Sequence, residues 1–418
     1  MPRPALPPAQ QGAAACSDCV LMSASSTVST AAVAPSLRPF AVFYFAYFAF
    51  QGLFGPFWGL YLESLSFSAL QISVLMALST LARIVAPGFW GWLADRQGRR
   101  RAIIISTSLC SALAFALVGL GQGFWWIFTS LAVSHLFWAG ALPLVEASTA
   151  YLTRAQPGRY SRVRVWGSIG FVCLSMVGGY VLDLIHLANL PWALLLLLAL
   201  IVLAGCYVPE VAARRQQALA APIWHTLRQP KVLALFACCF LMAYAHGPYY
   251  TFYSIGLRHA GYDKGAIGLL WSVGVISEIL VFLLMPRIMG RFALERLMLA
   301  SLLTAVLRFV LIACVIEQPA LAVLAQSMHA LTFGLHHASS VGLIHRLFAE
   351  QHQGRAQGLY IIASFGVGGS SGGLVGGLLW PHGGMLPTFG MSVLAALLGV
   401  LVCLRWLRPE QGLHATAA

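Results

Sequence analysis

The chain of 418 residues is 59% apolar and only 9% charged, and its formal net charge is +13. An ordinary soluble domain has about a quarter of its residues charged, because a single buried core leaves a large surface that polar groups must cover. The composition therefore excludes a soluble enzyme and indicates an integral membrane protein. Lys231 and Lys264 are the two lysines, and neither precedes Ser or Thr, so the sequence has no P-loop for nucleotide hydrolysis.

The first 38 residues are rich in Ala, Pro, Ser and Thr and contain no apolar stretch long enough to span a bilayer. We expect a disordered cytoplasmic tail at 1–38, without the pattern of a signal peptide. Its Cys16-x-x-Cys19 motif lacks a second ligand pair for zinc and the strand–helix context of a redox site. The sequence predicts neither a metal site nor a cofactor.

Apolar runs of about 20 residues recur from Phe40 onward, and each is long enough to cross the hydrocarbon core. They lack the alternation of barrel strands, and backbone groups in lipid must be satisfied within the segment, so we expect helices in an all-α fold. The twelve predicted spans are 40–62, 68–93, 102–120, 124–150, 164–187, 190–208, 230–256, 265–286, 293–314, 318–345, 356–380 and 385–407.

The basic residues predict the orientation of these helices. Arg258 and Lys264 are the only ones in loops that follow odd-numbered helices, and Arg83 and Arg308 lie inside predicted helices. All the others lie in even-numbered loops or in the termini. The positive-inside rule therefore places both termini in the cytoplasm, and a bacterial inner membrane is the expected location. Arginines scattered between apolar runs also argue against nucleic-acid binding, which requires a basic face on a polar domain.

The longest polar connection, 209–229, divides the helices six and six. We expect an N-terminal bundle at 39–208, a cytoplasmic linker at 209–229, a C-terminal bundle at 230–407 and a short tail at 408–418. Two halves of nearly equal length are typical of a transporter built from two repeats around a site at the bilayer midplane.

The loop between the second and third helices carries the segment GWLADRQGRRR, Gly91 to Arg101. It resembles the signature loop of the major facilitator superfamily, Gly-x-Leu-Ala-Asp-Arg-x-Gly-Arg-Arg/Lys. Gly91 would allow close helix approach, Gly98 a tight turn with positive φ, and Asp95 could face a helix N-terminus. The alternative is an ordinary basic cluster on the cytoplasmic side. The resemblance implies a conformational motif, whose residues are Gly91, Asp95, Arg96, Gly98, Arg99 and Arg100.

A second resemblance covers the fourth and fifth helices. The segments PLVEAS (143–148) and RYSRVRVWGSIGF (159–171) are similar to those of the lactose-permease family and its phenylpropionate-permease relatives. In that family a glutamate and an arginine eighteen residues later form a charge pair that contacts substrate. The matching residues are Glu146 and Arg164, and Phe171 matches the aromatic residue that stacks on sugar. The alternative is a salt bridge at the cytoplasmic ends of the two helices.

Glu278, Arg308 and His329 lie near the middle of consecutive predicted helices in the second half, where an uncompensated charge is unfavourable. Arg308 and His329 match positions that the lactose-permease family uses in proton coupling, whereas Thr332 replaces its proton-carrying carboxylate. We therefore expect Glu278 to be the coupling acid, with Arg308 and His329 tuning it. A change in the distance between Glu278 and Arg308 would then load and release the proton.

Further polar residues of the predicted helices have two readings each. Arg83 could bind a substrate anion or only extend to the interface, and His246 could contact substrate or form an interhelical hydrogen bond. Tyr249 and Tyr250 could line a cavity for an aromatic ring or pack. The glycines between Gly366 and Gly377 have small-xxx-small spacing, which favours close helix packing.

We conclude that the chain resembles a twelve-helix major facilitator transporter of the lactose-permease and phenylpropionate-permease branch, not an enzyme. The resemblance implies alternating access and proton symport of a small organic solute, and the arginines and aromatic rings favour an aromatic carboxylate such as a phenylpropionate. The expected partners are the substrate, protons and the lipid bilayer, and we expect a monomer. The alternatives are a sugar or nucleoside symporter, a proton-driven drug exporter, and a receptor or scaffold without transport activity.

Overall fold

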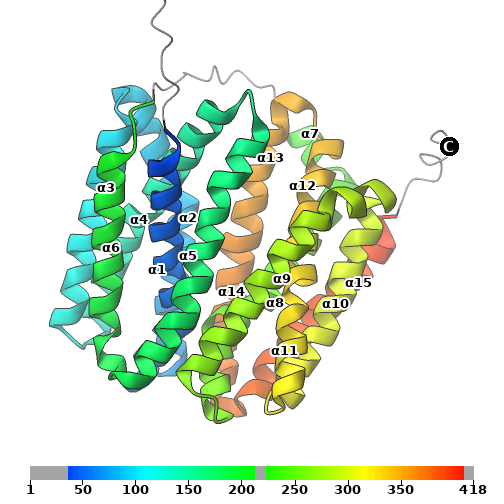
Figure 1. Cartoon of the computed structure of the whole chain (residues 1–418). Coiled ribbons are helices and arrows are strands. Elements are labelled where there is room, and N and C mark those ends of the chain that lie inside the picture. Colours follow the sequence, from blue (N-terminus) through cyan, green and yellow to red (C-terminus); the bar gives the residue numbers. More distant parts are fainter. Residues whose placement is uncertain (1–35, 212–222, 409–418) are drawn as a thin grey trace, which may run out of the picture. The chain divides into compact units, whose positions relative to one another are not determined.

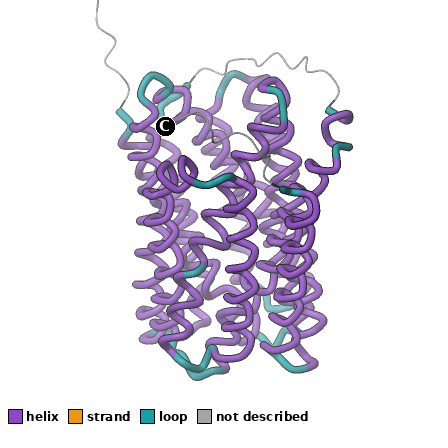
Figure 2. Tube along the Cα trace, turned by 90° about the vertical axis from the view of Figure 1, so that its right-hand side faces the viewer, coloured by secondary structure: helices purple, strands orange, loops and turns teal. Residues whose placement is uncertain are grey.

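The computed structural model describes residues 36–211 and 223–408. Most of the predicted tail at 1–38, the centre of the 209–229 linker and nearly all of the 408–418 tail lie outside these ranges. Helices make up almost all of the described trace, and most of the loops that join them lie at the two ends of the helix bundle (Figure 2). The fold is all-α, as the sequence predicts.

The helices run roughly side by side along one direction (Figure 1). The first half of the fold consists of α1 (Arg38–Ser64), α2 (Ala69–Gln97), α3 (Arg100–Ala116), α4 (Phe124–Thr153), α5 (Pro157–Leu184) and α6 (Leu190–Tyr207). The second half follows the short α7 (Trp224–Leu227) and consists of α8 (Pro230–His259), α9 (Lys264–Arg291), α10 (Leu294–Val315), α11 (Pro319–Ser327), α12 (His336–Leu347), α13 (Glu350–Ile361), α14 (Ser370–Leu379) and α15 (Met385–Trp406).

Eleven helical stretches of the described chain are long and apolar enough to cross a bilayer. The predicted tenth span is also present, but a π-helical turn at Ala330–Leu335 separates its two pieces, α11 and α12, which are each too short to cross alone. A second π-helical turn, Ile362–Gly369, joins α13 to α14 within one crossing. The tenth and eleventh predicted helices are therefore each a single crossing that contains a π-helical segment.

The hydropathy-based boundaries are wrong where helices extend beyond the apolar run. α5 begins at Pro157, seven residues before the predicted 164, so that Arg159, Arg162 and Arg164 belong to the helix and not to a loop. Pro at the first helical position suits a helix start because its missing N–H has no partner there. α13 likewise begins at Glu350 rather than 356. Polar helix ends give no hydropathy signal.

The two halves repeat the same pattern of neighbours. In the first half α1 packs on α5 and α6, and α3 packs on α4 and α6. In the second half α8 packs on α14 and α15, and α10 packs on α12 and α15. α1 and α8 are the most completely buried crossings, which is expected for helices that are apolar on every face. Contacts between the halves run from α5 to α9, from α2 to α14 and from α1 to α8.

Close packing of α14 on α8 depends on the glycine run. A Cβ atom on Gly372 would overlap the backbone oxygen of Tyr244, and one on Gly247 would overlap the backbone of α14. The glycines therefore let two helix backbones touch, as their spacing predicts.

We expect Gly372→Val to lower the thermal unfolding temperature of the purified protein, because the added side chain has no room and overpacking costs about 1–3 kcal/mol. Gly390→Val is the matched control, since a Cβ atom at Gly390 on α15 meets no atom within 4 Å. Equal unfolding temperatures for the two variants would contradict this packing.

Candidate functional site

A cavity with a volume of 760 Å³ lies between the two halves. That volume is within the range of small-molecule sites. Its walls come from α1, α2, α4 and α5 on one side and from α8, α9 and the two π-containing crossings on the other. All seven residues predicted to bind substrate line it: Arg83, Glu146, Arg164, Phe171, His246, Tyr249 and Tyr250. Glu278 and His329 also line the cavity, whereas Arg308 lies behind its wall.

Glu146 of α4 and Arg164 of α5 form an ion pair on the cavity wall, with 3.5 Å between Oε1 and Nε. About a third of each side chain is exposed, so the pair is accessible from the cavity. The Arg164 guanidinium also lies over the ring of Phe48, 4.2 Å from its centroid, and 5.4 Å from that of Tyr44. These rings of α1 fix the direction in which Arg164 presents its remaining donors.

Arg83 of α2 is exposed in the cavity, and its guanidinium lies 5.1 Å from the centroid of the Trp138 ring. Trp138 is buried and stacks on Tyr47 at 4.4 Å between centroids. Within the described ranges no carboxylate lies at ion-pair distance from Arg83. It is therefore a cation held in place by an aromatic ring, with its donors available.

Arg308 of α10 is completely buried and is surrounded by neutral acceptors. Its Nε donates to the Ala325 carbonyl (2.9 Å), Nη2 to Gln326 Oε1 (3.1 Å), and Nη1 to His246 Nε2 (3.1 Å) and Thr332 Oγ1 (3.2 Å). No ion pair with Glu278 exists in the described part of the chain. The coupling hypothesis requires Arg308 to approach Glu278. Arg308 does not do so in this conformation, because its guanidinium N–H groups already donate hydrogen bonds to neutral acceptors.

The hydrogen bonds of His246 determine its tautomer. Nδ1 lies 2.8 Å from the Met242 carbonyl, which can only accept, so Nδ1 carries the proton. Nε2 then accepts from Arg308 Nη1 at 3.1 Å. His246 is neutral in this arrangement, and its interhelical role is the one that the geometry supports. A second proton on Nε2 would point at a guanidinium, so His246 does not take up a second proton while Arg308 stays in place.

Glu278 and His329 face the cavity from α9 and from the residue before the π-helical turn. A Cβ atom on Gly334 would lie 3.3 Å from Glu278 Cγ, which places the glutamate side chain against the π turn. The His329 ring stacks on Phe333 at 5.3 Å and on Tyr249 at 5.5 Å between centroids, and its buried Nδ1 has no partner in the described structure. Together with Trp271, 4.9 Å from Tyr249, these rings form an aromatic wall of the second half.

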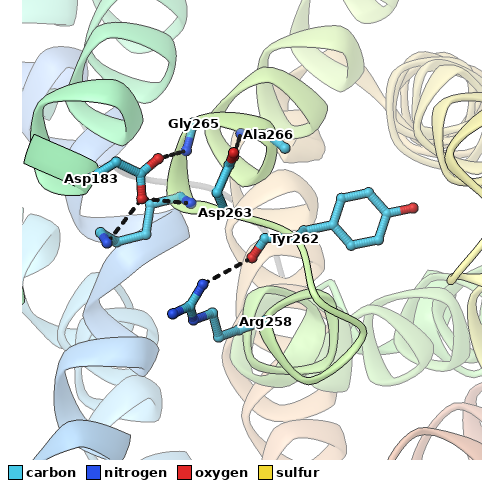
Figure 3. A network of polar contacts seen from close by, with 7 residues as sticks. Asp183, Arg258, Tyr262, Asp263, Gly265 and Ala266 are labelled. Carbon is cyan, nitrogen blue, oxygen red and sulfur yellow. Dashed lines mark hydrogen bonds and ion pairs between the residues drawn. The ribbon is translucent and has the colours of Figure 1, made fainter.

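The two halves also meet at the end of the fold opposite the start of α1 and the end of α15 (Figure 1). Asp183, at the end of α5, accepts hydrogen bonds from the backbone N–H groups of Lys264 (3.1 Å) and Gly265 (2.7 Å), the first residues of α9. Lys264 Nζ adds an ion pair at 2.9 Å. Figure 3 shows Asp183 reaching across to the start of α9. A carboxylate suits this position because the N-terminus of a helix carries unpaired donors and partial positive charge.

Two further contacts extend this seal between the halves. His259 Nε2 of α8 lies 2.9 Å from Glu63 Oε1 of α1. Ser175 of α5 donates to the Gly268 carbonyl of α9 at 3.2 Å, deeper along the same helix pair. We call these contacts, together with that of Asp183, the seal.

The loop with the superfamily signature adopts only part of the predicted geometry. Gly98 ends α2 with φ of 67°, as the turn prediction requires. Asp95 pairs with Arg100 at 3.2 Å, next to the start of α3. The expectation that Gly91 permits close helix approach is wrong for this conformation, because a Cβ atom there would meet no atom within 4 Å. Arg96 lies over the ring of Trp92 at 5.5 Å.

Several residues of the site gave no usable sequence signal. Phe48 lies in an aromatic-rich run and is indistinguishable from packing residues, although it supports Arg164. Gln326 is a neutral residue in an apolar segment, yet it accepts from both Arg308 and Tyr249. Asp183 and Lys264 each lie at a helix end on the same predicted side, which indicates polar ends but not a contact between helices that are far apart in sequence.

Comparison with known proteins places this geometry in a family context. Residues 37–391 match the MFS_1 like family. The chain is 28% identical over 322 residues to a protein of Escherichia coli (strain K12) named as a probable 3-phenylpropionic acid transporter, covering 75% of this chain and 83% of that one. It is 26% identical over 381 residues to a maltose permease of Geobacillus stearothermophilus, covering 89% and 95%. The crystal structure of the nucleoside transporter NupG has the same fold, with a TM-score of 0.76 at 18% identity and coverage of 89% and 98%.

We expect Asp183→Asn to weaken the seal, because the variant keeps an acceptor oxygen but loses the charge that faces Lys264 and the α9 N-terminus. A cysteine introduced at Ser175, in a background without native cysteines, should then react with a maleimide about three- to tenfold faster, as loss of roughly 1 kcal/mol implies.

Asp263→Asn is the matched control, since Asp263 caps the same helix through Ala266 N (2.6 Å) but makes this contact within its own half (Figure 3). The seal hypothesis predicts no faster labelling in that variant. An unchanged rate in Asp183→Asn, or an equal increase in both variants, would rule the hypothesis out.

Proposed function

Because the chain belongs to the MFS_1 like family and is a transporter of the major facilitator type, we propose that it is a proton-coupled symporter of a small aromatic carboxylate that works by alternating access. The observation that carries this proposal is the cavity between the halves, which combines an accessible Glu146–Arg164 ion pair and an unpaired Arg83 with an aromatic wall. Such charges in a bilayer are expensive unless they face water, a ligand or one another.

The choice of an anionic aromatic substrate follows from the charges and rings of the cavity. Arg83 and Arg164 line it, Arg308 lies directly behind its wall, and the acids that line it are Glu146 and Glu278. Arg308 and Arg83 have no acidic partner in the described chain, so the site has positive charge in excess and favours an anion. Phenylpropionate combines a carboxylate with a ring, and a relative of this chain is named for that acid.

The other candidate functions fit the cavity less well. Sugar or nucleoside symport agrees with the names of a maltose permease relative and a nucleoside transporter of the same fold, but those solutes carry no charge to match Arg83. Drug export predicts a more apolar cavity with low selectivity. A receptor or scaffold without transport has no need of charges on the wall of a cavity between the two halves.

We further propose that both termini and the 209–229 linker are cytoplasmic and that the protein is a monomer in a bacterial inner membrane. The distribution of arginines supports this orientation. The seal would then lie on the outer side, and the conformation described here would be the one with access from the cytoplasm.

Reconstituted proteoliposomes test the function directly. With 3-phenylpropionate outside, we expect uptake of solute together with protons, while maltose and uridine should give neither. Proton uptake that responds to maltose or uridine, and not to 3-phenylpropionate, would contradict the aromatic carboxylate and indicate a sugar or a nucleoside as the substrate.

The Glu146–Arg164 pair should contact the substrate. We expect Glu146→Gln and Arg164→Ala each to weaken 3-phenylpropionate binding by at least tenfold, because removing one partner leaves the other charge unpaired beside the ligand. Binding by the detergent-purified protein is the measurement, and an unchanged unfolding temperature is the control for folding. Affinity equal to wild type in either variant would remove the pair from the site.

Glu278 should carry the coupled proton, since it is the acid of the second half that lines the cavity. We expect Glu278→Gln to lose uphill accumulation driven by a proton gradient but to retain exchange of labelled for unlabelled substrate, because exchange needs no net proton release. Glu146→Gln should lose both reactions and serves as the comparison. Accumulation against a gradient by Glu278→Gln would assign coupling to another group.

A further inference from the structure

Arg83 differs from the other arginines of the site in having no acceptor. Arg164 is paired with Glu146 and lies over Phe48, and Arg308 is fully buried with four acceptors. Arg83 lines the cavity, is exposed there, and contacts the face of the Trp138 ring. A ring face holds a guanidinium by its π-system and leaves the N–H fork at the edge free for an anion.

Tyr250 of α8 presents the complementary donor from the other half. It lines the same cavity with 37% of its surface exposed, and its hydroxyl makes no hydrogen bond within the described residues. Neighbouring rings hold it in place, at 5.2 Å from Tyr249 and 6.3 Å from Trp271 between centroids. Arg83 and Glu278 line the same cavity as Tyr250.

We propose, on the basis of the function proposed above, that Arg83 and Tyr250 form the subsite that binds the substrate carboxylate between the two halves. The guanidinium donates two hydrogen bonds to the carboxylate oxygens, and the phenol donates one from the opposite wall. The aromatic wall of Tyr249, Trp271 and His329 receives the ring. Glu278 lines the same cavity, so that the coupled proton and the bound anion would share it.

This subsite assigns distinct tasks to the two accessible arginines. Arg164, paired with Glu146, contacts the substrate without setting its charge preference, whereas Arg83 distinguishes an acid from its neutral analogue. A substrate bound to Arg83 of α2 and Tyr250 of α8 also connects the halves, which a solute lacking the carboxylate does not do.

The test compares 3-phenylpropionate with 3-phenylpropionamide, which keeps the ring and chain but carries no charge. Equilibrium binding is measured on the full-length protein in detergent. Wild type should prefer the acid, and Arg83→Gln should weaken acid binding by about ten- to a hundredfold, as for a hydrogen bond to a charged group, while amide binding changes by less than about twofold. Arg83→Lys should keep part of the preference, and Tyr250→Phe should weaken acid binding several-fold.

Arg154→Gln is the matched control, because Arg154 also lies over a ring, 4.6 Å from the centroid of Tyr151, but outside the cavity. It should bind both compounds as wild type does. Arg83→Gln protein that keeps the wild-type ratio of acid to amide affinity would overturn the subsite, and so would an equal loss of affinity for both compounds. Wild-type protein that binds neither compound would instead overturn the proposed substrate class, and the subsite with it.

Discussion

A bilayer core offers no partner to a charged side chain, so each charge in a membrane span must be satisfied by the protein or by the water of a cavity. The three arginines of the site meet this constraint in three different ways. Arg164 pairs with Glu146, Arg308 is enclosed by neutral acceptors, and Arg83 faces the cavity over a ring. The cavity lies where α2, α4 and α5 bring their charged residues opposite the rings of α8 and Glu278 of α9. The cavity is therefore needed to satisfy the charges that the helices carry within the membrane.

The seal likewise satisfies charged and polar groups, here at the end of the fold where α5 meets the start of α9. The donors at the start of α9 and the Lys264 side chain are satisfied by a single carboxylate from the other half. Because each partner also reaches water, separating them is far less unfavourable than separating a pair in the hydrocarbon. These contacts between the halves therefore lie near the surface, while the deeply buried network around Arg308 stays within one half.

Hydropathy was sufficient to predict the membrane crossings, because a bilayer imposes length and polarity on every one of them. It failed at the start of α5, where arginines continue the helix beyond the apolar run, and it could not reveal the break between α11 and α12. The cavity residues were predicted from buried charges and from a family resemblance. The partners of Arg308 were not, since contacts between helices depend on rotation about each axis, and a one-residue difference moves a side chain about 100° around the helix.

The π-helical turn at Ala330–Leu335 decides which side chains the following helix shows to the cavity. A π turn holds more residues than an α turn, so everything after it is rotated relative to a regular continuation. In α12 this rotation brings His337 to within 3.0 Å of the Tyr360 hydroxyl and leaves His336 bonded to Ser301 at 2.9 Å. A regular helix of the same sequence would point both imidazoles elsewhere. The π-helical turn therefore sets the rotation of α12 about its own axis. With this rotation His336 packs against α10, and His337 faces the cavity.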